Sequence, residues 1–361
     1  MNEIVCNLHI HSTFSDGSGN YASIIQAALK TEVQVIILTD HNIHVRGLEG
    51  YYGADNHQVL VLTGEEVHDQ NRHPQKNHTL VIGAEKEMAG FAYEPQLLIN
   101  EVRKTGGLSF LAHPYEFDLP LINEPDISWV DWSVEGFNGL ELWNGMSEFK
   151  TVSRTLLTAL KHLYMPELVA HQPLPATLKK WDELLCSGHK VSAIGGSDAH
   201  AIKIHKGPIK RIAYPYEFHF SAINNHLLLE EDLNGNLAHD KAIIFDALRR
   251  GSSFIGYDLP ASTRGARFVI ENEEGVFSPG DTLGLDSGAT ARVSLPENAH
   301  LRLIHNGRVI HEAQNSNRLL YTISEPGVYR LECLIYFIGK ERGWIYTNPI
   351  HAVENRKRKV L

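Results

Sequence analysis

Short runs rich in valine, isoleucine and leucine alternate with stretches of helical periodicity from the start of the chain to about Asp258. This alternation is typical of repeated β-α units around a parallel sheet, because parallel strands need a crossover connection that is usually a helix. Seven strands are expected, and that number favours an α/β barrel over an open sheet. The expected strands span residues 4–10, 33–39, 59–63, 79–83, 108–112, 139–143 and 191–194, and the expected helices span residues 21–30, 95–105, 152–163, 177–187 and 240–251.

The pattern of apolar and polar residues changes after about Pro260. Apolar and polar residues alternate there in the runs 291–295, 301–304, 319–323 and 328–336, and no helical period survives. Asn306-Gly307 stands between two of these runs and predicts a β-hairpin, because both residues tolerate positive φ. We therefore expect an α/β domain over residues 1–259 and a small antiparallel β-sandwich, of the immunoglobulin-like kind, over residues 260–361.

The net charge and the cysteine content exclude several classes of protein. A formal net charge of -10 argues against binding a long nucleic acid or an anionic membrane through bulk electrostatics. Three widely separated cysteines offer neither a disulfide framework nor a cysteine-based zinc site. The N-terminus lacks a signal-peptide pattern, and no long apolar run occurs, so the expected location is the cytoplasm.

Histidines and carboxylates stand at the ends of the expected strands. His9 and His11 lie two residues apart near the end of the first strand, so that both project to one face, and Asp16 follows in the next loop. Further candidates at strand ends are Asp40, His41, Glu65, Glu66, His78, His113, Asp198 and His200. So many ionisable groups at one end of a barrel need cations to neutralise them, which predicts a metal cluster. Imidazole and carboxylate ligands without thiolates suit zinc, manganese or iron.

The ordered motifs HIHSTFSDG, TDHN, GEE, AHP and GSDAH resemble those of the PHP superfamily, named for its polymerase and histidinol-phosphatase members, and the match spans Ile4 to about Asp258. The resemblance implies a distorted seven-stranded β/α barrel that holds two or three divalent metal ions. It also implies three sets of ligands. His9, His11 and Asp198 would hold one metal, His78 and His113 a second, with Glu66 bridging these two, and Asp16, His41 and His200 a third.

The same resemblance favours Glu66 over Glu65, because the family's glutamate follows a residue that is usually apolar. Two cations that share a water lower its pKa toward about 7, so the expected nucleophile is a metal-bridging hydroxide. Asp198, His200 and Glu66 are the expected catalytic residues. Glu141, at the end of another strand, either orients a ligand or makes a strand-terminal hydrogen bond.

These expectations favour a phosphoesterase that cleaves a small phosphomonoester or phosphodiester. The segments ALRRGSSFIGYD and WIYTNPI are similar to the carbaryl-hydrolase-like branch, which leaves a carbamate, amide or carboxyl-ester hydrolase as an alternative. A non-catalytic metal-dependent binding protein is a third hypothesis. Arg46, Lys203 and Lys206 closely follow the ligand motifs and are the expected residues for binding an anionic substrate.

Overall fold

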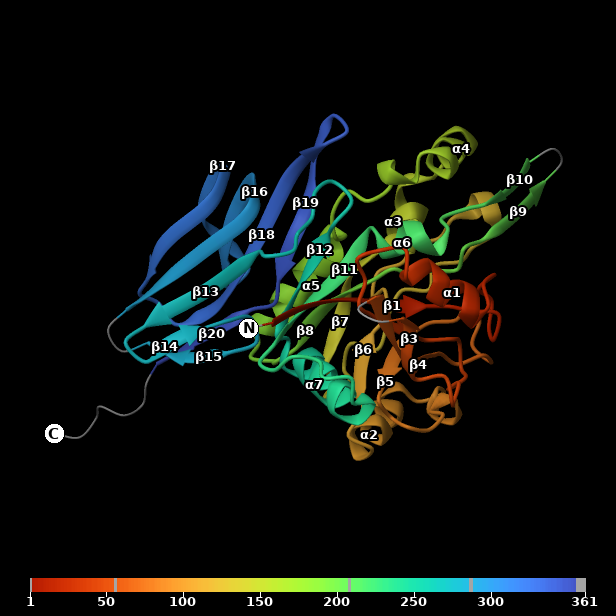
Figure 1. The fold of residues 1–361 in the computed structure, drawn as a ribbon, viewed down its shortest axis with the longest axis horizontal. Coiled ribbons are helices and arrows are strands. Elements are labelled where there is room, and N and C mark those ends of the chain that lie inside the picture. The colour runs from red at the N-terminus through yellow and green to blue at the C-terminus, as the bar shows by residue number, and fades with distance from the viewer. Residues whose placement is uncertain (1, 55–56, 207–208, 286–287, 355–361) are drawn as a thin grey trace.

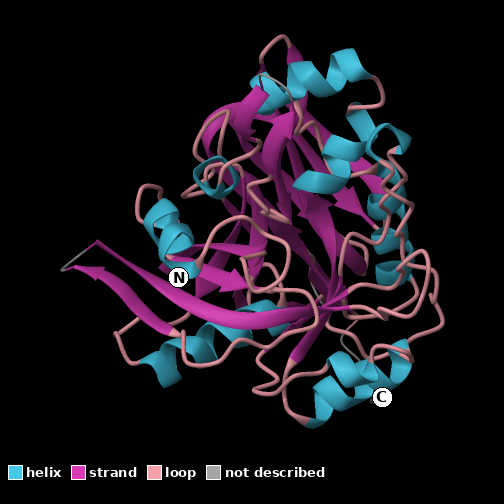
Figure 2. Cartoon of the chain, turned by 90° about the vertical axis from the view of Figure 1, so that its right-hand side faces the viewer, coloured by secondary structure: helices cyan, strands magenta, loops and turns pink. Residues whose placement is uncertain are grey.

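The computed structural model describes residues 2–54, 57–206, 209–285 and 288–354 of the chain. Strands and helices are mixed in the N-terminal part, and the C-terminal part consists of strands that lie beside it (Figure 1). Helices lie around the periphery and strands run through the middle (Figure 2). The predicted mixed α/β class is confirmed.

Seven strands of the N-terminal part form a closed series of pairings. They are β1 (Asn2–Ile10), β2 (Val35–Leu38), β4 (His57–Val67), β5 (Thr79–Ile82), β6 (Leu108–Leu111), β7 (Gly139–Asn144) and β8 (Ser192–Gly196). Each strand pairs with the next one in this series. The series returns to its start after β8, where the backbone N–H of Ala199 donates to the carbonyl of His9 at 3.1 Å and its carbonyl accepts from the N–H of His11 at 3.0 Å. Every strand predicted in this part of the chain is present.

The expectation of a parallel sheet is wrong for β5, which pairs antiparallel with both β4 and β6. The segment between β4 and β5 contains no helix, so the chain reverses there instead of crossing over. The start of β5 therefore lies beside the ends of β4 and β6, with Thr79 opposite Val67 on one side and Leu111 on the other. This reversal brings His78, the residue before β5, to the end of the ring where β4 and β6 finish.

Four of the described helices follow the predicted positions, one expected helix is corrected, and two further helices were not predicted. The described helices are α1 (Tyr21–Ala28), α2 (Pro95–Lys104), α3 (Gly145–Val152), α4 (Leu156–Tyr164), α5 (Pro175–Cys186), α6 (Tyr216–Phe220) and α7 (Leu237–Arg250), with short 3-10 turns η1 (Ala89–Phe91), η2 (Pro120–Ile122) and η3 (Pro166–Leu168). The single helix expected over 152–163 is wrong, because Thr155 and Thr158 form a capping box that starts a new helix, α4. None of the helices in the described segments has the length and hydrophobicity needed to cross a membrane.

The C-terminal part is built from strands of very different lengths that pair antiparallel, except for the parallel pair of β15 and β20. Its strands are β13 (Arg267–Asn272), β14 (Gly275–Phe277), β15 (Thr282–Gly284), β16 (Ala289–His305), β17 (Arg308–Ile323), β18 (Gly327–Phe337), β19 (Lys340–Thr347) and β20 (Ile350–Val353). The predicted hairpin at Asn306-Gly307 is confirmed, since both residues have positive φ and His305 pairs with Arg308. Leu303, Leu331 and Trp344 belong to a hydrophobic core that these strands enclose.

The two parts of the chain share a continuous sheet. The remaining strands are β3 (Gly50–Ala54), which pairs with β4, the hairpin of β9 (Lys203–Lys206) and β10 (Ile209–Ile212), and β11 (Ile223–Leu229) and β12 (Ser253–Tyr257). β11 pairs with β1, and β12 pairs with β11 on one side and with β19 on the other. The domain boundary between residues 259 and 260 stays a prediction, as do the barrel and sandwich descriptions.

His226 of β11 is buried where β1 and the segment after β12 meet. Its Nδ1 lies 2.7 Å from Oε1 of Glu3, and its Nε2 lies 3.2 Å from Oδ2 of Asp258. Burial opposes the charged form of His226, but hydrogen bonds to Asp258 and Glu3 outweigh burial and raise its pKa above the usual value. A protonated His226 therefore links three segments that are distant in the sequence.

We predict that His226→Gln lowers the free energy of unfolding by roughly 3 kcal/mol at pH 6, because Asp258 loses its cationic partner and Glu3 keeps only Arg267. A raised folded-state pKa stabilises the fold fully below the unfolded value of about 6.5, and this stabilisation is lost as the pH rises through the folded-state value. The difference between wild type and variant in urea unfolding should therefore shrink at pH 9. An equal difference at both pH values would contradict this.

Candidate metal centre

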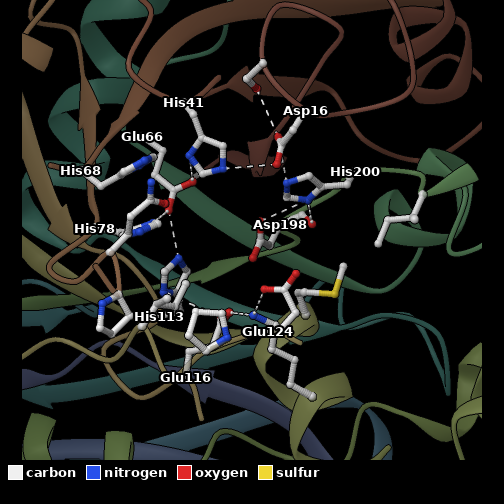
Figure 3. Close-up of a pocket in the computed structure, with 18 of the residues that line it drawn as sticks. Asp16, His41, Glu66, His68, His78, His113, Glu116, Glu124, Asp198 and His200 are labelled. Carbon is white, nitrogen blue, oxygen red and sulfur yellow. Dashed lines mark hydrogen bonds and ion pairs between the residues drawn. The ribbon is translucent and has the colours of Figure 1, made fainter. Parts of the chain in front are cut away.

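The predicted metal ligands come together at one end of the ring of strands. Figure 3 shows the labelled members of this set around a cavity, with Asp16, His41 and His200 on one side and His113 on the other. The predicted ligands that come together are His9, His11, Asp16, His41, Glu66, His78, His113, Asp198 and His200. All of these residues lie at a strand end or in the turn that adjoins it.

Glu66 stands at the centre of the cluster. Its carboxylate oxygens lie 2.7–3.2 Å from a ring nitrogen of each of these histidines: His9, His11, His41, His78 and His113. Its side chain is buried. One buried carboxylate is therefore shared by five imidazoles from four different segments of the chain, since His9 and His11 both lie at the end of β1.

The ligand atoms fall into overlapping groups, within each of which all atoms lie within 4.8 Å of one another. Three of these groups are His9, His11, Glu66 and Asp198; Glu66, His78 and His113; and His11, Asp16, His41 and His200. These groups contain the three ligand sets that the PHP resemblance implies, and His11 also reaches the third. Which residue binds which ion stays a prediction.

Three of the candidate ligands have a positive φ angle, which residues other than glycine rarely adopt. His9, His113 and Asp198 have φ angles of 66°, 26° and 50°. Residues held in such regions cost of order 1–3 kcal/mol each and persist only where the surrounding structure over-determines them. In β1 the unusual φ coincides with a shift of register between Leu8 and Ile10, which turns the His9 side chain toward the cluster.

Glu141, in the middle of β7, holds two of the histidines in place. Its Oε1 lies 2.7 Å from Nδ1 of His9, and its Oε2 accepts the backbone N–H of His113 at 2.7 Å. Gly196 makes room for this carboxylate, since a Cβ there would lie 1.5 Å from Oε1 of Glu141. Glu141 therefore fills both of the roles left open for it by the sequence.

The tautomers of two histidines suit metal ions. Nδ1 of His9 faces Glu141, and Nδ1 of His200 lies 2.9 Å from the carbonyl of Asp198, so both of these nitrogens carry a proton. In each neutral ring Nε2 is left with a lone pair, yet these atoms face carboxylate oxygens of Glu66 at 3.0 Å and Asp16 at 3.2 Å. Two acceptors that face each other need a cation or an additional proton between them.

Orphaned nitrogen atoms in the described residues support the same fit. Both ring nitrogens of His11 and Nδ1 of His41 are buried without a hydrogen bond. Oε2 of Glu66 nevertheless lies 3.2 Å from each of these two histidines. These nitrogen and oxygen atoms lie close together without hydrogen-bond geometry, as the ligands of a shared metal ion do. The residues present therefore fit divalent cations.

The charges of the cluster shift the pKa values of its histidines. Burial opposes protonation of His9, but the carboxylates of Glu141, Asp198 and Glu66 raise its pKa well above the usual value. Burial is likewise outweighed at His11 and His113, whose neighbouring carboxylates raise the pKa of each to about 9. Protons therefore occupy these imidazoles at neutral pH when no cation is bound.

Sequence reasoning missed two residues of the site and the role of a third. His68 belongs to a group with His41 and His78, and Glu116 to a group with His113 and Asp198. The only available signal was their closeness in sequence to Glu66 and His113. Asp40 lies outside the groups, but it accepts the backbone N–H of Ser12 at 2.7 Å and the hydroxyls of Ser12 and Ser15, and so holds the loop that carries Asp16.

All the candidate ligands except His9 and His11 line a cavity of about 740 Å³ that also has apolar walls. The predicted substrate-binding residues Arg46 and Lys203 are exposed and lie outside its lining. Their role in substrate binding stays a prediction, and Lys203 donates to the carbonyl of Ser18 at 3.2 Å. The side chain of Lys206 lies outside the described part of the structure.

We predict that Glu66→Gln removes most of the bound metal, because an amide cannot supply the negative charge that the cluster shares among its ions. Metal content per chain, measured by elemental analysis after dialysis against zinc or manganese, should fall by at least about tenfold relative to wild type.

Glu65→Gln is the matched control. The Glu65 side chain points away from the cluster, where it accepts the backbone N–H of Met88, and burial raises its pKa to about 8. The carboxyl group is therefore mostly neutral at pH 7, so an amide replaces it at little cost. Equal metal loss in both variants would contradict the assignment of Glu66 as a metal ligand.

Metal binding should release protons at pH 7, because the raised pKa values of His9, His11 and His113 mean that cations displace protons. The apparent affinity for zinc or manganese should consequently fall as the pH is lowered from about 9 to 6. Titration calorimetry in two buffers of different ionisation enthalpy measures the number of protons released. A value of zero would mean that the imidazoles are not the ligands.

Comparisons with known proteins give a family match and include two similar solved structures. No curated protein matches the chain. A two-domain protein of Bacteroides vulgatus that contains a predicted PHP-like metal-dependent phosphoesterase is similar at 15% identity, covering 96% of this chain and 95% of that one with a TM-score of 0.42. A presumed metal-dependent phosphoesterase of Bifidobacterium adolescentis is similar at 14% identity, covering 57% and 90% of the two chains with a TM-score of 0.32. The carbaryl-hydrolase-like branch stays a prediction. Residues 7–112 match the family model of the PHP domain, which confirms the predicted PHP resemblance over that part of the chain.

Proposed function

We propose that the protein is a metal-dependent phosphoesterase that hydrolyses a small phosphomonoester or phosphodiester. The observation that supports this most strongly is the set of imidazoles and carboxylates around Glu66, which lies at the wall of a cavity of about 740 Å³. A cavity of this size suits a small molecule. The match to the PHP domain in the same part of the chain supports the same assignment.

Two or three ions of zinc, manganese or iron would be held by the three ligand groups described above. Bound there, such ions supply an activated water at neutral pH and neutralise charge on the oxygens of a phosphoryl group. The protein orients its ligands through the hydrogen bond from His9 to Glu141 and through the carbonyl of Asp198, which accepts from His200. Asp40 fixes the loop of Asp16. These contacts pre-organise the site before substrate arrives.

Asp198 and His200 are the proposed proton-handling residues. Both line the cavity, and the His200 side chain is the more accessible, with 15% of its surface exposed against 8% for Asp198. Asp198 lies between Nε2 of His9 and Nε2 of His11, at 3.5 and 3.3 Å, so it is the more deeply engaged as a ligand. His200 is therefore the better placed of the two to give a proton to the leaving oxygen, a role that requires its Nε2 to carry a proton in place of an ion.

We predict that Asp198→Asn lowers the hydrolysis of p-nitrophenyl phosphate by at least ~100-fold, because a ligand of the cluster loses its charge. The measurement is steady-state release of nitrophenol with added manganese or zinc. Asp246→Asn is a control, since Asp246 is a partly exposed residue of α7 that pairs with Arg250.

Three substrates separate the proposal from its alternatives. p-Nitrophenyl phosphate and bis-p-nitrophenyl phosphate distinguish a monoesterase from a diesterase, and a naphthyl carbamate tests the carbamate alternative. Cleavage of the carbamate alone would replace the proposal with that alternative. Metal binding without turnover of any of the three would favour a binding protein instead.

A further inference from the structure

Lys150 is the one lysine or arginine among the described residues that line the cavity. The other charged groups of the lining are carboxylates, together with the imidazoles of the cluster. An anionic substrate that enters the cavity would therefore meet a single permanently positive side chain of the protein. This residue belongs to α3, which the sequence did not associate with the site.

The start of α3 fixes the position of Lys150. The helix begins directly after β7, where the side chain of Asn144 accepts the backbone N–H of Ser147 at 2.8 Å. Ser147 and Lys150 are three residues apart and so lie on one face of the helix. Both contact the same carboxylate, because the hydroxyl of Ser147 donates to Oε2 of Glu116 and Nζ of Lys150 donates to Oε1, each at 2.5 Å.

Glu116 connects Lys150 to the candidate metal centre. Its Oε2 lies 3.7 Å from Nδ1 of His113, and ligand atoms of Glu116, His113 and Asp198 lie within 4.8 Å of one another. Figure 3 shows Glu116 and Glu124 on the side of the cavity opposite Asp16 and His41. The ammonium group is thus separated from the cluster by a single carboxylate.

The second partner of Lys150 is a weak one. Oε2 of Glu124 lies 3.4 Å from Nζ, and the Glu124 side chain is 46% exposed whereas that of Lys150 is 7% exposed. An ion pair to a partly exposed carboxylate contributes little. An anion in the cavity could therefore take the place of Glu124 without breaking the buried contact to Glu116.

We propose that Lys150 is the anion-binding residue of the site and that its Nζ donates to a non-bridging oxygen of the substrate's phosphoryl group. This inference rests on the proposed phosphoesterase function. A buried ion pair contributes little net free energy to the stability of a fold. The ion pair with Glu116 therefore does not by itself explain a lysine at this position. On a cavity wall beside candidate metal ligands, the same ammonium group completes a receptor for a phosphate.

The remaining lining narrows the substrate class. Phe14, Ile122 and Ile202 line the cavity and are 53%, 54% and 43% exposed. A second phosphate or a carboxylate on the substrate would meet no further lysine or arginine in the described lining, and Glu124 would repel it. The preferred substrate is therefore an ester with one anionic phosphoryl group and an uncharged, apolar alcohol.

The direct test is the binding of inorganic phosphate to the manganese-loaded protein by titration calorimetry. Lys150→Met should weaken binding by about tenfold or more, whereas Lys150→Arg should keep most of the affinity. Lys104→Met is the control, because Lys104 is an exposed residue of α2 paired with Glu101. Unchanged phosphate affinity in Lys150→Met, or no phosphate binding by the wild type, would overturn the inference.

Removal of the lysine leaves Glu116 buried without its cation, which could impair folding. The comparison is therefore repeated between Glu116→Gln and the double variant Glu116→Gln/Lys150→Met. The double variant should again bind phosphate about tenfold more weakly than the single one. Equal affinities in this background would also count against Lys150.

The inference and the proposed function fail in different ways. Phosphate binding that depends on Lys150, without turnover of any phosphoester, would keep the anion site and remove the enzymatic proposal. Turnover of p-nitrophenyl phosphate with a KM unchanged in Lys150→Met would keep the enzyme and remove the anion site.

A matched pair of substrates tests the substrate class. The wild type should hydrolyse 4-methylphenyl phosphate with a kcat/KM at least about fivefold higher than 4-carboxyphenyl phosphate. The carboxylate makes the phenol a better leaving group, so leaving-group chemistry alone predicts the opposite order. Equal or reversed values would overturn the apolar preference.

Discussion

Five imidazoles converge on the buried carboxylate of Glu66, and the rest of the structure depends on how this concentration of polar groups is neutralised. Isolated charges are too costly to bury, and the ring nitrogens that face carboxylate oxygens without hydrogen bonds cannot satisfy one another. Divalent cations satisfy both kinds of group at once. The unusual backbone angles of His9, His113 and Asp198 show that the fold holds these ligands against a local conformational cost.

The scaffold meets this demand through the directions of its strands. Parallel strands bring their carboxyl ends to one edge, and the reversed strand β5 contributes its start at that same edge. Supporting carboxylates then fix the orientation of the ligands, with Glu141 behind His9 and Asp40 behind the loop of Asp16. Gly196 is part of the same arrangement, because any larger residue would displace Glu141.

Much of the fold and of the candidate site could be predicted from the sequence, because the spacing of hydrophobic residues and the residue types are local properties. The seven strands, the hairpin at Asn306-Gly307 and the cluster of candidate ligands follow from such local signals. The reversal of β5 and the break between α3 and α4 depend on tertiary packing and on a single capping interaction, which periodicity does not report. Nearness in sequence favoured Arg46 and Lys203, whereas the cation of the cavity wall, Lys150, comes from a distant helix.

The central claim is that the groups around Glu66 hold divalent cations. Its most direct test is a crystal structure of the manganese- or zinc-loaded protein with data collected at the absorption edge of the metal. The account predicts anomalous peaks within bonding distance of His9, His11 and Asp198, and of His78 and His113, with Glu66 between the two. A well-ordered site without anomalous peaks, or with metal bound only elsewhere on the protein, would contradict it.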